Sequence, residues 1–189
     1  MFTRDIVVFD TETTGLDISK HELIQIAAIR LDKDNLAEKN RYESFIKPSH
    51  WETQNPKAAE VHQISYDTVK DAPTPEVVLA EFEQAFPPTE VLLSAYNFPF
   101  DFSFLYDTYR KLGKQCPYDF HGVDIWAFAY YFWSNTAHTI NPEKRNGFGL
   151  SDVASMLGII NSGTYHQAMV DCEVEVEVLR RLLAKLKLV

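Results

Sequence analysis

A short apolar run that ends in two carboxylates constrains the fold of this chain more than any other feature. The run covers residues 6–9 (Ile-Val-Val-Phe) and is followed by Asp10 and Glu12. β-Branched and aromatic residues in so short a run indicate a buried strand. Side chains at positions i and i+2 of a strand lie on the same face, so we expect Asp10 and Glu12 to project into the same space.

Two neighbouring carboxylates repel each other unless a proton or a cation lies between them. Mg²⁺ and Mn²⁺ prefer oxygen ligands of this kind, so the pair is a candidate metal site. Taken alone, the pair is more simply explained by a strand end whose acidic side chains are solvated. Other parts of the chain must decide between these two interpretations.

Hydrophobic periodicity indicates a single α/β domain over residues 1–189, with a mixed sheet. Strands are predicted at residues 23–31, 42–46 and 91–93. Helices are predicted at residues 56–62, 75–86, 99–112, 123–133 and 151–157, and a last helix runs to the C-terminus. Residues 134–149, which contain Asn, Pro, Lys, Arg and two Gly, are predicted to form a loop. Residues 173–178 alternate Glu and Val as a strand would, but the longer apolar stripe through Val178 and Leu182 favours a helix.

Composition excludes some classes of function. With 27 acidic and 18 basic residues, the net charge of −9 argues against a protein that coats long duplex nucleic acid through charge alone. An enzyme that binds a short strand end is not excluded. Cys116 and Cys172 form no CxxC pair, which argues against a structural zinc site and favours a cytoplasmic protein with reduced thiols. The longest unbroken apolar stretch, residues 125–133, is too short to cross a bilayer, so no membrane association is expected.

Two further patterns contain an aspartate, and one of them also contains a histidine. Asp101 ends the sequence Asn-Phe-Pro-Phe-Asp and falls in the first turn of a predicted helix, where a carboxylate suits the helix dipole. His166 and Asp171 are five positions apart, a spacing that on a helix would rotate one side chain away from the other by about 140°. They can therefore meet at one site if His166 lies in the loop before the helix. Separately, each pattern has an ordinary explanation, as a helix cap or a surface loop histidine.

Together the three patterns resemble the motifs of the DEDDh, or DnaQ-like, family of 3′–5′ exonucleases, typified by the proofreading epsilon subunit of bacterial DNA polymerase III. The first motif is Phe-Asp-Thr-Glu-Thr-Thr-Gly-Leu at residues 9–16. The second is Tyr-Asn-Phe-Pro-Phe-Asp at residues 96–101, where the family has roughly His-Asn-x-x-Phe-Asp. The third, His-x-Ala-x-x-Asp, is matched without change at residues 166–171. The order and the spacing fit, and the resemblance extends over about residues 5–183.

The resemblance implies a ribonuclease H-like fold, with a mixed five-stranded sheet flanked by helices. It also implies catalytic roles for Asp10, Glu12, Asp101, His166 and Asp171. The four acidic residues would hold two divalent metal ions, Mg²⁺ or Mn²⁺, with Asp10 bridging both. His166 would be the general base that takes a proton from the attacking water, so that the terminal phosphodiester is hydrolysed and a nucleoside 5′-monophosphate is released.

The same resemblance assigns four residues to the end of the substrate strand. Thr13 would meet the terminal 3′-hydroxyl and Leu16 would wedge against the last base. His62 and Asn97 would line the pocket of the terminal nucleotide. Other interpretations stay open at this point, with Leu16 as a core residue and His62 as a capped helix end.

The chain departs from the family pattern at several positions. Tyr96 replaces the usual histidine of the second motif and Phe98 replaces a small residue, which favours a narrower groove for the strand. Gln63 replaces the glycine that usually follows the counterpart of His62. The aromatic stretch at residues 126–133 is either core or a stacking surface for bases.

We therefore predict a metal-dependent 3′–5′ exonuclease that acts on single-stranded ends. DNA is slightly favoured because the first motif is more similar to the proofreading branch than to the oligoribonuclease branch. RNA 3′-end trimming or oligoribonuclease activity is the alternative. A nucleic-acid-binding protein without turnover and a phosphodiesterase for small nucleotides are competing hypotheses. No segment that would tether the chain to a polymerase is evident, and a homodimer remains open.

Overall fold

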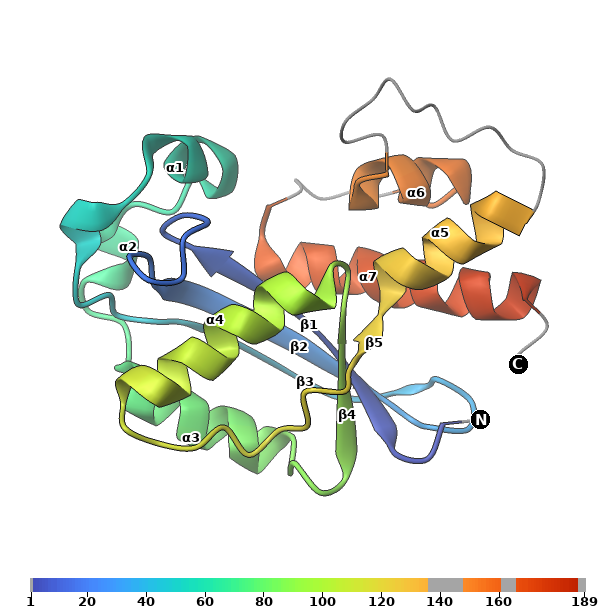
Figure 1. Ribbon diagram of the computed structural model, residues 1–189, viewed down its shortest axis with the longest axis horizontal. Helices are drawn as coiled ribbons and strands as arrows, with labels where there is room; N and C mark the ends of the chain where they lie inside the picture. Colours follow the sequence, from blue (N-terminus) through green and yellow to red (C-terminus); the bar gives the residue numbers. More distant parts are fainter. Residues whose placement is uncertain (1, 136–147, 161–165, 187–189) are drawn as a thin grey trace.

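A mixed five-stranded sheet with helices on both faces forms the centre of the molecule (Figure 1). The computed structural model describes residues 2–135, 148–160 and 166–186. The order of the strands across the sheet is β3-β2-β1-β4-β5. The strands are β1 (Asp5–Thr13), β2 (Leu23–Leu31), β3 (Glu38–Phe45), β4 (Val91–Ala95) and β5 (Val123–Asp124). The pairs β3·β2 and β2·β1 are antiparallel, whereas β1·β4 and β4·β5 are parallel. The predicted α/β fold with a mixed five-stranded sheet is therefore confirmed.

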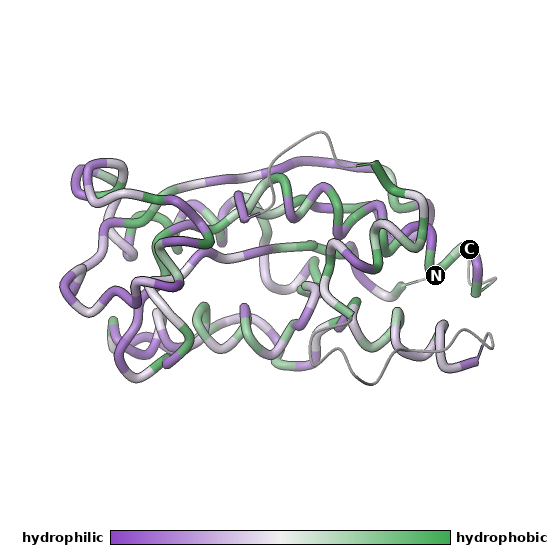
Figure 2. The backbone as a smooth tube through the Cα atoms, turned by 90° about the horizontal axis from the view of Figure 1, so that it is seen from above, coloured by the Kyte–Doolittle hydropathy of each residue, from purple (hydrophilic) through white to green (hydrophobic). Residues whose placement is uncertain are grey.

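The helices form one layer on each side of the sheet. They are η1 (Trp51–Thr53), α1 (Pro56–His62), α2 (Tyr66–Val69), α3 (Pro75–Ala85), α4 (Phe98–Lys111), α5 (Ile125–Asn135), α6 (Leu150–Met156) and α7 (Ala168–Lys185). Helices α3 and α4 cover one face, and α5, α6 and α7 cover the other (Figure 1). Along the helices in Figure 2, hydrophobic and hydrophilic residues alternate, as expected where one side of a helix is buried. None of the described helices is long and apolar enough to cross a membrane.

The alternation of side chains along β1 determines which face each acidic residue points to. Ile6 and Val8 belong to the hydrophobic cluster under α7, and Val7 and Phe9 belong to the cluster under α3 and α4. Because a strand alternates with a period of two, the even-numbered Asp10 and Glu12 continue on the α7 side. The expectation that these two carboxylates share one face is therefore confirmed.

Helix α7 packs closely on β1 and β2. Cys172 is fully buried there, and its Sγ lies 3.3 Å from the backbone oxygen of Ala27 and 3.8 Å from that of Val8. A small side chain at this position allows the helix axis to approach the sheet. As a result, the neighbouring residue Asp171 lies beside the carboxyl end of β1.

Sequence periodicity predicted some boundaries well and others poorly. The predicted ranges 23–31 and 56–62 agree with β2 and α1. The hydrogen-bonded pairing with β2 carries β1 past Phe9 as far as Thr13, so the strand is longer than its apolar run. η1 and α2 were not found, because each is too short to show a hydrophobic period. The helix predicted from residue 123 is wrong at its start, because residues 123–124 pair with β4 as the strand β5 and α5 begins at Ile125. Most of the loop predicted at residues 134–149 lies outside the described residues.

The aromatic stretch before that loop divides between the core and the surface. Trp133 is buried in the cluster that includes α7. Trp126, Tyr130 and Tyr131 are exposed, and the rings of Trp126 and Tyr130 stack with their centroids 5.2 Å apart. The interpretation as core therefore holds for Trp133, and a stacking surface for bases stays a prediction for the exposed rings.

The cluster under α3 and α4 is built around Phe82. Its side chain is fully buried, and its ring makes edge contacts with Tyr42, Phe86 and Tyr118 at centroid distances of 6.1, 5.0 and 5.6 Å. We predict that Phe82→Ala lowers the free energy of unfolding by about 3–5 kcal/mol, because it leaves a cavity among these rings. Denaturation by urea measures this change, and Phe120→Ala, at a side chain that is 71% exposed, is the matched control. Equal stability of the two variants would contradict this description of the core.

Candidate active site

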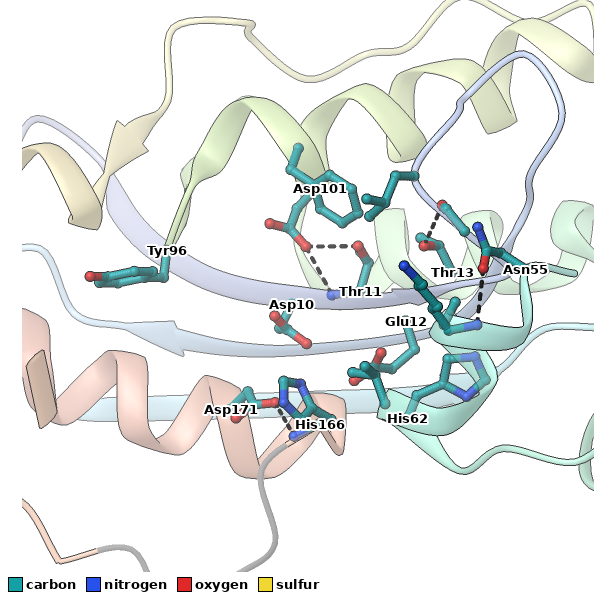
Figure 3. Close-up of a pocket in the computed structure, with 16 residues that line it drawn as sticks. Asp10, Thr11, Glu12, Thr13, Asn55, His62, Tyr96, Asp101, His166 and Asp171 are labelled. Atoms are coloured by element: carbon teal, nitrogen blue, oxygen red, sulfur yellow. Dashed lines mark hydrogen bonds between the residues drawn. The ribbon is translucent and has the colours of Figure 1, made fainter. Parts of the chain in front are cut away.

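All five residues predicted to be catalytic line one pocket at the carboxyl ends of β1 and β4. The pocket has a volume of about 370 Å³. The five residues are Asp10, Glu12, Asp101, His166 and Asp171. Figure 3 shows Asp101 on the α4 side of β1 and Asp171 and His166 on the α7 side. Residues that are far apart in the sequence are thus brought to one end of the sheet.

Asp101 is held against β1 by Thr11. The backbone N–H of Thr11 donates to Asp101 Oδ1 at 3.0 Å, and the Thr11 hydroxyl donates to the same oxygen at 2.7 Å. Thr11 points to the α4 side because it alternates with Asp10 and Glu12 along the strand. Neither hydrogen bond uses Asp101 Oδ2. The strand thus fixes the orientation of a carboxylate that belongs to the first turn of α4.

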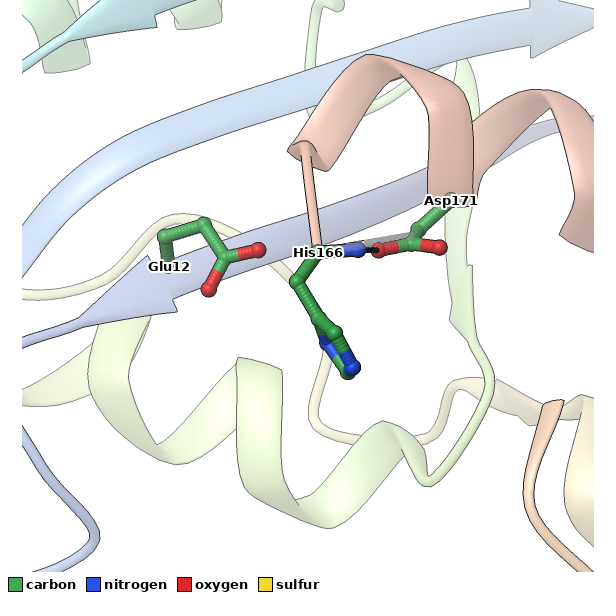
Figure 4. A group of neighbouring side chains, drawn as sticks. All are labelled: Glu12, His166 and Asp171. Carbon is green, nitrogen blue, oxygen red and sulfur yellow. Dashed lines mark hydrogen bonds between the residues drawn. The ribbon is translucent and has the colours of Figure 1, made fainter. Parts of the chain in front are cut away.

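His166 and Asp171 meet because His166 precedes α7. The backbone of His166 has a φ of 67°, a left-handed conformation that is uncommon outside glycine, and its N–H donates to Asp171 Oδ2 at 2.7 Å. This arrangement confirms the expectation that His166 lies in a loop and Asp171 on a helix. Glu12, His166 and Asp171 each have a ligand atom within 4.8 Å of the others (Figure 4).

The carboxyl groups of the pocket are crowded and poorly solvated. Burial, followed by the charges of Asp171 and Asp101, raises the pKa of Glu12 to about 8. Burial raises the pKa of Asp101 to about 7, although its hydrogen bonds from Thr11 oppose this change. Burial and the neighbouring carboxylates raise the pKa of Asp10 well above its usual range. Protonation of these groups relieves their repulsion in the absence of a cation.

The donor set of the pocket fits a divalent cation. Asp171 Oδ1 is buried and has no hydrogen-bond partner among the described residues. Lys57 is the only Lys or Arg among the described residues that line the pocket. Carboxylate oxygens crowded together in this way are the ligands that Mg²⁺ and Mn²⁺ prefer. A bound cation would replace the protons that otherwise neutralise the group.

Three of the four residues assigned to the substrate line the same pocket. They are Thr13, Leu16 and His62. Leu16 is 79% exposed, so its interpretation as a core residue is wrong. The Thr13 hydroxyl donates to the backbone oxygen of Gly15 at 2.9 Å. Asn97 is exposed with a φ of 72° before α4, and it does not line the pocket.

His62 combines a structural role with a free ring nitrogen. It is the last residue of α1, and its Nδ1 accepts a hydrogen bond from the backbone N–H of Ile64 at 2.9 Å. Its Nε2 is buried without a partner among the described residues. Gln63, at the helix end, has a φ of 59°, in the region where glycine is favoured. The glycine that the family usually has there matches this conformation.

Sequence reasoning missed several residues that shape the pocket. The imidazole of His21 packs against Gly15, and a Cβ added to Gly15 would come within 2.6 Å of that ring. The loop that carries Leu16 therefore needs a glycine at this position. Glu175, one helical turn after Asp171, is a further buried carboxylate. The helical spacing of four residues from Asp171 is the signal that places Glu175 on the same side of α7.

Comparison with known proteins relates the chain to exonucleases. A protein-family model, RNase_T, described as an exonuclease, matches residues 7–179. A PolC-type DNA polymerase III from Streptococcus pneumoniae serotype 2 is 37% identical over 105 residues, which are 56% of this chain and 7% of that protein. A PolC-type DNA polymerase III from Staphylococcus aureus is 28% identical over 181 residues, which are 96% of this chain and 11% of that protein. The chain thus spans only about a tenth of the length of these relatives.

Solved structures show the same fold. E. coli exonuclease I in complex with a dT13 oligonucleotide matches with a TM-score of 0.75 and 18% sequence identity. The match covers 96% of this chain and 41% of the exonuclease I chain. This likeness confirms the ribonuclease H-like fold expected from the motifs.

The raised pKa of Glu12 predicts how stability depends on pH. Without metal, Glu12 binds more protons in the folded state than in the unfolded state between about pH 4.5 and pH 8, so its contribution to stability falls as pH rises through this range. We expect wild-type protein in chelator to lose at least about 4 °C more in Tm across this range than Glu12→Gln. Mg²⁺ should recover most of the loss in the wild type at pH 8. Calorimetry in matched buffers measures both effects. An equal pH dependence of Tm in the two proteins would contradict a raised pKa at Glu12.

Proposed function

The chain belongs to the RNase_T exonuclease family, the DnaQ-like 3′–5′ exonucleases, and we propose that it releases nucleoside 5′-monophosphates one at a time from single-stranded 3′ ends. One observation carries this proposal. Four carboxylates and a histidine from three separate segments converge on one pocket beside an exposed leucine. A pocket built in this way suits the hydrolysis of a phosphodiester at the end of a strand.

Asp10, Glu12, Asp101 and Asp171 would hold two divalent cations, Mg²⁺ or Mn²⁺. The raised pKa values of these groups and the unpartnered Oδ1 of Asp171 support this assignment. When bound, two such ions stabilise the attacking and leaving oxygens of an in-line displacement at phosphorus. Thr11 keeps Asp101 in a fixed orientation, so little reorganisation of that carboxylate is needed.

His166 would act as the general base. Its side chain is exposed at the pocket, and its backbone N–H is tied to Asp171, which sets the position of the residue relative to the acidic group. Histidine is the side chain most often used to take a proton in such a step. A water oxygen forms a bond to the terminal phosphorus while His166 takes its proton. The bond between phosphorus and the 3′-oxygen of the preceding nucleotide breaks, and that oxygen takes a proton from solvent.

The terminal nucleotide would lie between Leu16 and His62. Leu16 is exposed in the unbound pocket and offers an apolar surface to the last base. The Thr13 hydroxyl, which donates a hydrogen bond to the backbone oxygen of Gly15 in the unbound pocket, would turn to the terminal 3′-hydroxyl. The free Nε2 of His62 offers a polar contact to the same nucleotide. Asn97 is left out of this assignment because it does not line the pocket.

Single-stranded DNA is the substrate that we favour. The first motif is more similar to the proofreading branch of the family, and exonuclease I, which has the same fold, has been solved with a DNA oligonucleotide. The negative net charge suits a protein that binds a short strand end better than one that follows a long duplex. Both cysteines are free thiols, which supports a cytoplasmic location.

The central test is digestion of 5′-labelled single-stranded DNA and RNA of equal sequence. We expect a ladder that shortens by one nucleotide at a time from the 3′ end in Mg²⁺ or Mn²⁺, faster on DNA, and no products in excess chelator. We expect Asp10→Asn and His166→Ala each to lower kcat by at least about a hundredfold, because both groups act on the reacting atoms. Asp67→Asn, at an exposed aspartate of α2, is the control and should keep full activity.

Each other result would assign the protein differently. Faster shortening of RNA would favour RNA 3′-end trimming or oligoribonuclease activity. Tight binding of strands without products would indicate a binding protein, and cleavage of dinucleotides alone would indicate a small-nucleotide phosphodiesterase. Wild-type rates for Asp10→Asn or His166→Ala would contradict the proposed roles of these residues.

The exposed position of Leu16 predicts a separate effect on substrate binding. Leu16→Ala should weaken the binding of single strands about tenfold, because about 1.5 kcal/mol of apolar burial against the last base is removed. Fluorescence anisotropy with labelled oligonucleotides in Ca²⁺ measures the Kd. Ile160→Ala, at a leucine-sized side chain that is 94% exposed and does not line the pocket, is the matched control. Equal Kd values for the two variants would remove Leu16 from the binding site.

A further inference from the structure

Glu175 is a buried carboxylate that the proposed mechanism does not use. The run at residues 173–178 contains three glutamates on α7. Glu173 is exposed and its carboxylate lies 2.8 Å from Arg41, and Glu177 lies 2.7 Å from Arg181. Glu175 is only 1% exposed and forms no ion pair among the described residues. It therefore differs from its two neighbours in both burial and charge compensation.

The surroundings of Glu175 are acidic. It lines a cavity of about 310 Å³ together with Asp10, Asp171, Tyr96 and Ser151. One of its oxygens accepts a hydrogen bond from the backbone N–H of Tyr96. Its Oε2 is buried and has no partner among the described residues. No Lys or Arg is found among the described residues that line this cavity.

This cavity shares four of its lining residues with the pocket of the candidate active site. Asp10, Tyr96, His166 and Asp171 line both the cavity and the larger pocket. The charge of Glu175 is also one of the four carboxylate charges that act on Asp10. Glu175 thus belongs to the same group of acids, in a cavity that Asp10 and Asp171 line and Glu12 does not.

An unpaired buried carboxylate strongly destabilises a fold unless a cation or a proton compensates its charge. A purely structural role, in which Glu175 only accepts the hydrogen bond from Tyr96, would be filled equally well by a glutamine. A glutamine in that position would avoid the repulsion from Asp10 and Asp171. The negative charge itself therefore needs an explanation.

We propose that Glu175 is a fifth acidic residue of the metal site and strengthens the binding of a divalent cation at Asp10. The inference rests on the proposed function, since it concerns the same cation. Glu175 acts as a positioning residue, through its charge and through Asp10, and has no contact with the reacting phosphodiester in this account. The chain thereby holds its cation with more negative charge than the four motif carboxylates supply.

The test is direct binding of Mn²⁺ to the full chain in the absence of nucleic acid. Electron paramagnetic resonance of free Mn²⁺ during a titration gives the Kd and the number of ions bound. We expect Glu175→Gln to raise the Kd for the tighter ion about tenfold, the lower end of the loss seen when groups behind metal ligands are changed. Glu173→Gln, with the same change of charge on an exposed side of α7, should alter the Kd less than twofold.

The outcomes separate this inference from the proposed function. Binding of Mn²⁺ to Glu175→Gln with the wild-type Kd, or more tightly, would overturn the role of Glu175 and leave the nuclease proposal standing. Absence of Mn²⁺ binding to the wild type would overturn both. Weaker binding by Glu175→Gln alone would support the inference even if no strand were cleaved. If Glu175→Gln does not fold, Glu175→Asp keeps the charge one methylene further away, and its Kd should lie above that of the wild type.

Discussion

Several carboxylates crowd together at the carboxyl end of β1, and their mutual repulsion must be balanced for the chain to fold around them. Asp10 and Glu12 belong to the strand, and Asp101, Asp171 and Glu175 approach from the helices on either side. In the folded protein without metal, burial and repulsion raise the pKa values of these groups, so protons supply part of the balance. A divalent cation supplies the same balance while leaving every carboxylate ionised.

Burial of the two hydrophobic clusters offsets the unfavourable repulsion among these carboxylates. Each cluster is built on alternate residues of β1, so the central strand is held from both faces. Specific contacts then orient the acids: Thr11 holds Asp101, and the close packing of Cys172 brings Asp171 to the end of the sheet. The backbone N–H of His166 donates a hydrogen bond to Asp171 Oδ2 and so helps to orient this carboxylate. The packing of the two clusters thus holds the strand and helices in place, and the geometry of the pocket follows from their positions.

Local periodicity could predict the parts of this account that depend on neighbours in the sequence. The strand period placed Asp10 and Glu12 on one face, and the helical angle between His166 and Asp171 correctly required a loop before α7. Contacts between distant residues, such as Thr11 with Asp101 and Gly15 with His21, follow from the packing of α4 and the first loop and leave no periodic signal.

Glu175 was missed for a different reason, since its alternation with valine resembles an exposed polar position. The family resemblance supplied what periodicity could not, namely the number of strands in the sheet and the grouping of three distant motifs. It was less informative at the edge of the pocket. Asn97 heads α4 in a left-handed conformation and lies outside the lining, whereas Leu16 is exposed at the pocket as expected.

The most direct measurement of the central claim is anomalous diffraction from crystals grown with Mn²⁺ and a nucleoside 5′-monophosphate. The account predicts two manganese peaks that share Asp10, with the base against Leu16. Manganese absent from the carboxylates, or a nucleotide bound away from this pocket, would contradict it.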